Sequence, residues 1–197
     1  MGPIRTNVPD NMPRLGNRFS RWLGRSLLRL LGWTLEGELP NDKKIMVALA
    51  PHTSNWDFIV AMPAIMGLGV KISYLMKKEA FFWPMSSTWK WLGGIPTDRS
   101  AAGGIVEQVA SYYAEHDKCW VAITPEGTRS KVAKWKTGFL RIAHRSNVPV
   151  VVIGFDGPGK RIVIDKKFYS KGDFEAEADE LREYVNEKFI GISPKHQ

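Results

Sequence analysis

The chain has 197 residues, which suits one domain with a full hydrophobic core. Its 44% hydrophobic and 24% charged content is that of a globular protein and argues against disorder outside the ends. A single cysteine, Cys119, excludes an internal disulfide, and no cysteines and histidines have zinc-ligand spacing, so we expect a reducing compartment and no metal. The net charge of +8 suits either nucleic acid or anionic lipid, and charge alone does not separate these partners.

Residues 1–35 favour lipid over nucleic acid. A helix is predicted over 14–33, and at 3.6 residues per turn its arginines fall within an arc of about 80°. These arginines are Arg14, Arg18, Arg21, Arg25 and Arg29. The opposite side carries Leu15, Phe19, Trp22, Leu23, Leu27 and Leu30, while Leu28 falls on the basic side. Five arginines forbid a membrane span but are typical of a helix on an anionic membrane surface. We expect this segment to bind the cytoplasmic face of a membrane, as a peripheral or monotopic protein; the alternative is a helix docked on its own domain.

Residues 50–58 place a histidine and a carboxylate at a strand-to-helix junction. A buried strand is predicted over 44–49, followed by a loop with His52 and a helix with Asp57 in its first turn. The carboxylate can accept a hydrogen bond from one imidazole nitrogen and leave the other nitrogen as a general base. An aspartate in a first helical turn is also ordinary dipole chemistry, so the pair has a purely structural interpretation as well.

Two further polar loops follow predicted strand ends. In the loop at 125–130, Gly127 permits a positive φ or close approach of a ligand, and Thr128 and Arg129 supply donors suited to phosphate oxygens. Arg99 stands just past a short apolar segment in the same way. The structural alternatives are a solvated turn and an ordinary surface arginine.

From Lys44 onward, strands alternate with helices, the pattern of an α/β domain with a mostly parallel central sheet flanked by helices. Strands are predicted near 44–49, 70–76, 94–96, 118–123, 149–155 and 160–164, and helices near 55–66, 81–91, 101–115, 137–146 and 174–189. We expect the N-terminal amphipathic helix to precede a single domain over 36–197. Because ligands bind beyond the carboxyl ends of parallel strands, His52, Arg99 and Glu126 should converge at one edge of the sheet.

Taken together and in this order, the motifs resemble those of the glycerolipid acyltransferases of the lysophosphatidic acid acyltransferase kind, over roughly 44–156. His52 and Asp57 match the H-x4-D catalytic pair of that family, Arg99 matches its second motif, and 125–130 matches its third.

The resemblance implies transfer of a fatty acyl group from acyl-CoA or acyl carrier protein to the hydroxyl of a lysophospholipid such as 1-acylglycerol-3-phosphate, in phospholipid biosynthesis or remodelling. No cofactor is implied beyond this acyl thioester. The residues implied to hold the acceptor and its phosphate are Arg99, Glu126, Gly127, Thr128 and Arg129. Among them, Glu126 is expected to order the loop or to pair with an arginine. The chain departs from the family pattern at two positions: Thr124 stands where an aromatic residue usually precedes the third motif, and Val152 stands where the fourth motif usually has a proline. These departures leave the identity of the acceptor open. The alternatives are a lysolipid without glycerol phosphate and a non-catalytic basic module that binds membrane.

For such a reaction we expect His52 to take the proton from the acceptor hydroxyl and Asp57 to stabilise the imidazolium. No Gly-x-Ser-x-Gly elbow is present and Cys119 falls in an apolar predicted strand, so attack should be direct, without an acyl-enzyme. Aromatic residues before Arg99 could form an apolar surface against an acyl chain. The sequence contains no recognisable nucleic-acid-binding motif.

Overall fold

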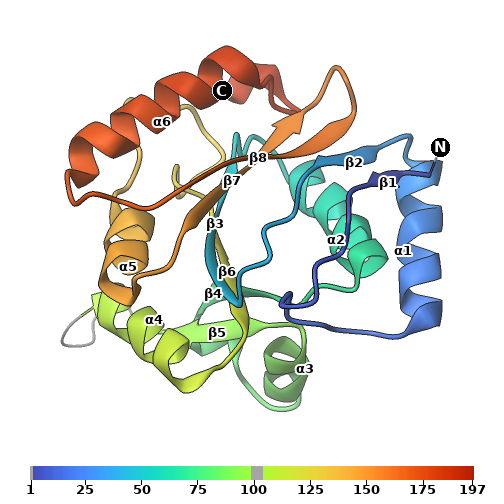
Figure 1. The fold of residues 1–197 in the computed structure, drawn as a ribbon, viewed down its shortest axis with the longest axis horizontal. Coiled ribbons are helices and arrows are strands. Elements are labelled where there is room, and N and C mark those ends of the chain that lie inside the picture. Colours follow the sequence, from blue (N-terminus) through green and yellow to red (C-terminus); the bar gives the residue numbers. More distant parts are fainter. Residues whose placement is uncertain (1, 99–103) are drawn as a thin grey trace.

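The computed structural model describes residues 2–98 and 104–197, which form an eight-stranded sheet with helices on both faces (Figure 1). The strands are β1 (Ile4–Arg5), β2 (Thr34–Gly37), β3 (Lys44–Ala50), β4 (Ile72–Lys77), β5 (Gly94–Thr97), β6 (Cys119–Ile123), β7 (Val150–Asp156) and β8 (Arg161–Phe168). The helices are α1 (Arg18–Leu30), α2 (Trp56–Leu68), α3 (Met85–Trp91), α4 (Gly104–Glu115), α5 (Gly138–Ser146) and α6 (Phe174–Lys188). Two short 3-10 turns complete the described elements, η1 (Lys78–Ala80) and η2 (Pro194–His196).

The strand order is β1-β2-β8-β7-β3-β6-β4-β5, and every neighbouring pair is parallel except β7 and β8. Strands β3 to β7 therefore point the same way, and the loops after β3, β5 and β6 leave from one edge of the sheet. The predicted α/β fold with a mostly parallel sheet is confirmed.

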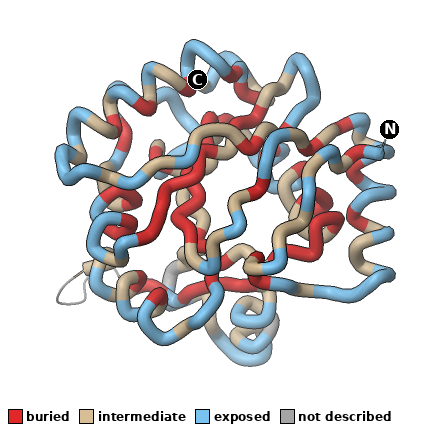
Figure 2. Tube along the Cα trace, viewed as in Figure 1, coloured by how far each residue is buried: buried red, intermediate tan, exposed pale blue. Residues whose placement is uncertain are grey.

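Strand β3 lies in the middle of the sheet and is apolar along almost its whole length. Because side chains alternate in a strand, Met46 and Ala48 face the core under α4, α5 and α6, while Ile45 and Val47 face the core under α1 and α2. A strand covered on both faces needs such a continuous apolar sequence. Figure 2 shows buried residues along the middle of the sheet and many exposed residues on the outer helices.

Helix α1 begins at Arg18, four residues later than the pattern of arginines predicted. Before it, the chain is extended, because the amide of Leu15 donates a hydrogen bond of 2.9 Å to the carbonyl of Gly69 after α2. The helix then starts with a capping box, in which Asn17 accepts from the amide of Ser20 and the Ser20 hydroxyl accepts from the amide of Asn17.

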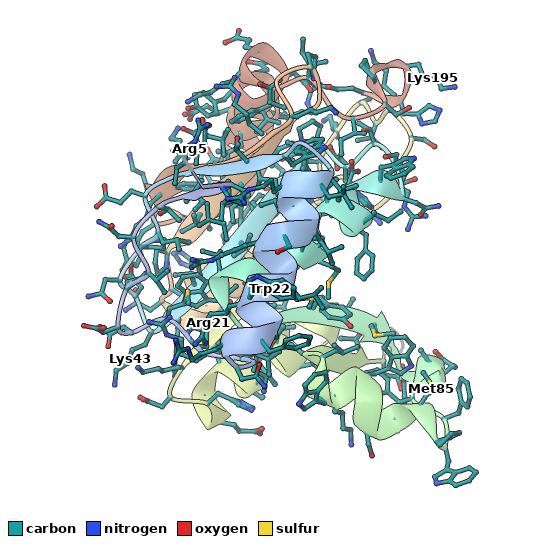
Figure 3. The ribbon with its side chains drawn as sticks, turned by 90° about the vertical axis from the view of Figure 1, so that its right-hand side faces the viewer. Arg5, Arg21, Trp22, Lys43, Met85 and Lys195 are labelled. Atoms are coloured by element: carbon teal, nitrogen blue, oxygen red, sulfur yellow. The ribbon has the colours of Figure 1, made fainter. Side chains whose placement is uncertain are left out.

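Helix α1 docks on α2 through Gly24 and Leu28, both of which are buried. A Cβ at Gly24 would overlap the backbone of Gly67, so the two helices meet backbone to backbone. The apolar face points the other way: Phe19 is 67% and Trp22 is 61% exposed. Figure 3 looks onto this face of α1. The helix is therefore docked on its own domain, yet its apolar side remains free.

Strands β1 and β2 were not predicted from the sequence. Strand β1 has only two residues, too few for any periodicity, and β2 is stabilised by its parallel pairing with β8. Because β2 spans the expected boundary after residue 35, the N-terminal segment and the rest of the chain share one sheet. Within the described residues, no helix is long and apolar enough to cross a membrane.

Candidate active site

The loop between β3 and α2 brings the predicted histidine and aspartate together. Nδ1 of His52 lies 3.0 Å from Oδ2 of Asp57. At this distance the carboxylate interacts favourably with the imidazole once the ring is protonated. The Asp57 side chain is only 1% exposed whereas that of His52 is 17% exposed, so the imidazole is the more accessible partner of the pair.

The carboxylate of Asp57 is held in place by the loop that carries the histidine. Its Oδ2 accepts hydrogen bonds from the amides of Thr53 at 2.7 Å and Ser54 at 2.8 Å. Hydrogen bonds to an ionised acceptor are stronger than neutral ones, so a buried carboxylate with two amide donors is fixed in position beside the imidazole.

Glu126 reaches the same loop from the turn after β6, the strand next to β3. The amide of His52 donates to both carboxylate oxygens of Glu126, at 2.9 and 3.1 Å. Burial raises the pKa of Glu126 to about 7, while the hydrogen bond from the His52 backbone and the nearby imidazole act in the opposite direction. Through these hydrogen bonds Glu126 ties the loop after β6 to the backbone of His52.

His52 and Asp57 lie in the wall of a cavity of about 1040 Å³. Small-molecule sites usually have about 300 to 1,000 Å³, so this cavity is large. Most of its wall is apolar and comes from α2, β4, α4 and α5; examples are Met62, Met66, Leu75, Val106, Phe139 and Ile142. Of the aromatic residues before Arg99, Phe82, Trp83 and Trp91 are all exposed, and among these three Trp91 also lines the cavity.

The loop after β6 adds cations to this otherwise apolar cavity. Gly127 has a φ of +65°, the left-handed conformation that the sequence predicted glycine to permit here. A Cβ at this position would lie 2.7 Å from Nζ of Lys136. Gly127, Arg129 and Lys136 all line the cavity, and Thr128 is exposed beside them. Among the described residues, no carboxylate forms an ion pair with either cation.

Arg99 lies outside the described residues. The strand before it, β5, pairs with β4 in parallel and points the same way as β3 and β6. The segment that leads to Arg99 therefore leaves the sheet at the edge where His52 and Glu126 lie.

Cys119 is buried at the start of β6, where burial raises the pKa of its thiol to about 11. A thiol with so high a pKa is a poor nucleophile at neutral pH.

Sequence reasoning missed several residues that complete the site. Leu15 and Ser20, from the N-terminal segment, line the large cavity. A second, polar pocket of about 370 Å³ is lined by His52 and Glu126 together with residues near the end of the chain, among them Arg182 and His196. No motif marks any of these positions, because each depends on how distant segments pack.

Comparison with known proteins identifies the family. The model of the acyltransferase family matches residues 33–156, whereas no curated protein sequence matches the chain. Among solved structures, the fold is similar to the crystal structure of the 1-acyl-sn-glycerophosphate (LPA) acyltransferase PlsC from Thermotoga maritima. The TM-score is 0.60 at 20% sequence identity, covering 90% of this chain and 76% of that chain. The matched region is more than half of the chain and contains His52, Asp57, Glu126 and Arg129, and we conclude that this protein belongs to the acyltransferase family.

Proposed function

We propose that the protein transfers a fatty acyl group from acyl-CoA or acyl carrier protein to the hydroxyl of a lysophospholipid of the 1-acylglycerol-3-phosphate type at a membrane surface. The observation that carries this proposal is the position of His52 and Asp57 in the wall of a large apolar cavity that also reaches Arg129 and Lys136. A substrate that suits this wall has a long hydrocarbon chain and an anionic group. The acceptor named for the structurally similar PlsC supports the same choice.

In the proposed reaction, the acceptor oxygen attacks the thioester carbonyl while Nε2 of His52 takes the hydroxyl proton. Asp57, next to Nδ1, stabilises the imidazolium that forms. The tetrahedral intermediate then collapses, the C–S bond breaks, and the thiolate leaves and recovers the proton from His52. The products are the ester and the free thiol, and no bond to the enzyme is formed.

The cations on the loop after β6 are proposed to bind the acceptor's phosphate. Arg129 offers a planar set of donors that matches phosphate oxygens, and Lys136 adds a point charge beside it. Arg99, whose strand ends at the same sheet edge, is proposed as the third cation.

The negative charge that develops on the thioester oxygen needs donors other than the nearest amides. The amides of His52, Thr53 and Ser54 already donate to the carboxylates of Glu126 and Asp57. We assign this role to Asn55, which lines the cavity next to these residues.

Exposed apolar side chains support membrane binding. They lie on α1, at the start of α2 and around α3, and include Phe19, Trp22, Trp56, Phe58, Trp83 and Trp91. Aromatic residues of this kind are enriched where proteins meet the membrane interface, and arginines on α1 add attraction to anionic lipid. A substrate that resides in the bilayer would then lie close to the cavity.

The test is an assay of purified protein with isotopically labelled acyl-CoA, and separately with labelled acyl carrier protein, against a panel of lysolipids with and without phosphate. Products are identified by mass. We expect an ester of 1-acylglycerol-3-phosphate, with none formed by His52→Ala. If esters form only from lysolipids without phosphate, the proposed phosphorylated acceptor is refuted. If no product forms at all, the proposed function is refuted.

A further inference from the structure

We propose that Thr53 is a positioning residue for His52, and that residues 190–197 hold it in place. This inference rests on the acyl-transfer role proposed above for His52. Residues 190–197 lie outside the region that matches the family model.

Thr53 is 1% exposed and connects three parts of the molecule. Its amide donates to Oδ2 of Asp57 at 2.7 Å. Its hydroxyl oxygen accepts a hydrogen bond of 3.0 Å from the amide of Ser193, and its carbonyl oxygen lies 3.1 Å from Nδ1 of His196. Thus every polar group of the residue next to the catalytic histidine has a partner, and two of these partners come from residues 190–197.

The segment that contacts Thr53 is itself fixed. The carbonyl of Ile190 accepts a hydrogen bond of 2.7 Å from the amide of Gly157. Gln197 closes the segment, because its side chain accepts from the amide of Gly191 at 2.7 Å and donates to the carbonyl of Phe189 at 2.8 Å. A Cβ at Gly191 would lie 2.5 Å from Cγ2 of Thr53, so glycine is needed for this close packing.

The physical argument concerns how a loop can hold a catalytic ring. His52 belongs to neither β3 nor α2, so the regular hydrogen bonds of those elements do not fix it. Glu126 holds its amide from one side and Asp57 holds the amide of Thr53 from another, and the hydroxyl and carbonyl of Thr53 supply the remaining restraint. A shift of about 1 Å in a reacting group can lower a rate about 100-fold, so a restraint one residue away can act on turnover.

The test compares Thr53→Val, which keeps the shape and removes the hydroxyl, with Thr53→Ser, which keeps the hydroxyl. Ser73→Ala is the matched control, because Ser73 is 2% exposed and its hydroxyl also makes one hydrogen bond, with Tyr112 at 3.0 Å. We expect Thr53→Val to lower kcat by about 10-fold or more with little change in either KM. Thr53→Ser should restore kcat, and Ser73→Ala should lose stability without this loss of kcat.

His196→Ala, compared with its exposed neighbour Lys195→Ala, tests the carbonyl contact in the same assay and should lower kcat less than Thr53→Val. The readout independent of activity is the NMR titration of the His52 imidazole, assigned by comparison with His52→Gln. Its resonances should shift in Thr53→Val and return in Thr53→Ser.

Wild-type kcat in Thr53→Val, or equal losses in Thr53→Val and Ser73→Ala in proportion to their lost stability, would overturn the inference. If the wild-type protein acylates no acceptor, the proposed function fails by itself. The His52 titration then still decides, because an imidazole that titrates identically in Thr53→Val and wild type would overturn the positioning role.

Discussion

Replacing Glu126 by glutamine should stabilise the protein at high pH relative to low pH. Burial raises the pKa of Glu126 from 4.5 to about 7, so between these values the folded state holds a proton that the unfolded chain has lost. The stability that Glu126 contributes as a neutral acid is therefore complete below pH 4.5, falls as the pH rises, and is lost above pH 7. One pKa unit corresponds to about 1.4 kcal/mol, which gives about 3 kcal/mol in total and about 2.5 kcal/mol between pH 5 and pH 8.

The assay is urea unfolding followed by tryptophan fluorescence at pH 5, 6, 7 and 8. Glutamine keeps an oxygen that can accept from the amide of His52 but cannot ionise, so the difference in unfolding free energy between Glu126→Gln and wild type should grow by about 2.5 kcal/mol from pH 5 to pH 8. Glu187→Gln, at an exposed position on α6, is the matched control. A difference that stays flat, or shrinks with pH, would refute the burial argument.

Four further outcomes are expected. His52→Ala should lower kcat by about 100-fold or more while circular dichroism shows an intact fold, since general base catalysis is worth at least that much; near-normal turnover would contradict the catalytic role. Arg129→Ala should chiefly raise the KM of a phosphorylated acceptor, and an unchanged KM would argue against phosphate binding. Trp22→Ser should reduce sedimentation with anionic liposomes without destabilising the domain, because the side chain is 61% exposed; equal binding would leave α1 with a structural role only. Cys119→Ser should keep most of the activity, and intact mass after mixing with acyl donor alone should show no acyl adduct.

The central part of the fold could be predicted because its signals are local. Strands β3 to β7 are apolar runs bounded by polar loops, so their predicted bounds agree with the structure to within about two residues. Strand β8, predicted over 160–164, instead continues to Phe168. The N-terminal part could not be predicted in the same way. Leu15 is pulled out of the helical pattern by Gly69, and β2 depends on pairing with β8, so both are determined by tertiary contacts.

The family and the convergence of the motifs at one sheet edge were also predictable, and the match to the acyltransferase family confirms the resemblance. The roles of the individual site residues stay predictions. What the sequence could not indicate is the direction in which Glu126 points, toward the backbone of His52, or the arrival of residues 190–197 behind Thr53. Such contacts join segments separated by more than 70 positions along the chain, and no periodicity encodes them.

The backbone contact between Gly24 and Gly67 has a mechanical consequence. Where side chains separate two helices, those side chains can change rotamer and absorb a small shift of one helix relative to the other. At the crossing point of α1 and α2 no side chain of Gly24 separates the backbones, since a Cβ there would overlap the backbone of Gly67. We therefore expect α1 and α2 to move together. In the membrane-bound arrangement proposed above, a shift of α1 relative to the surface would therefore shift α2 with it, together with the first turn of α2 that holds Asp57.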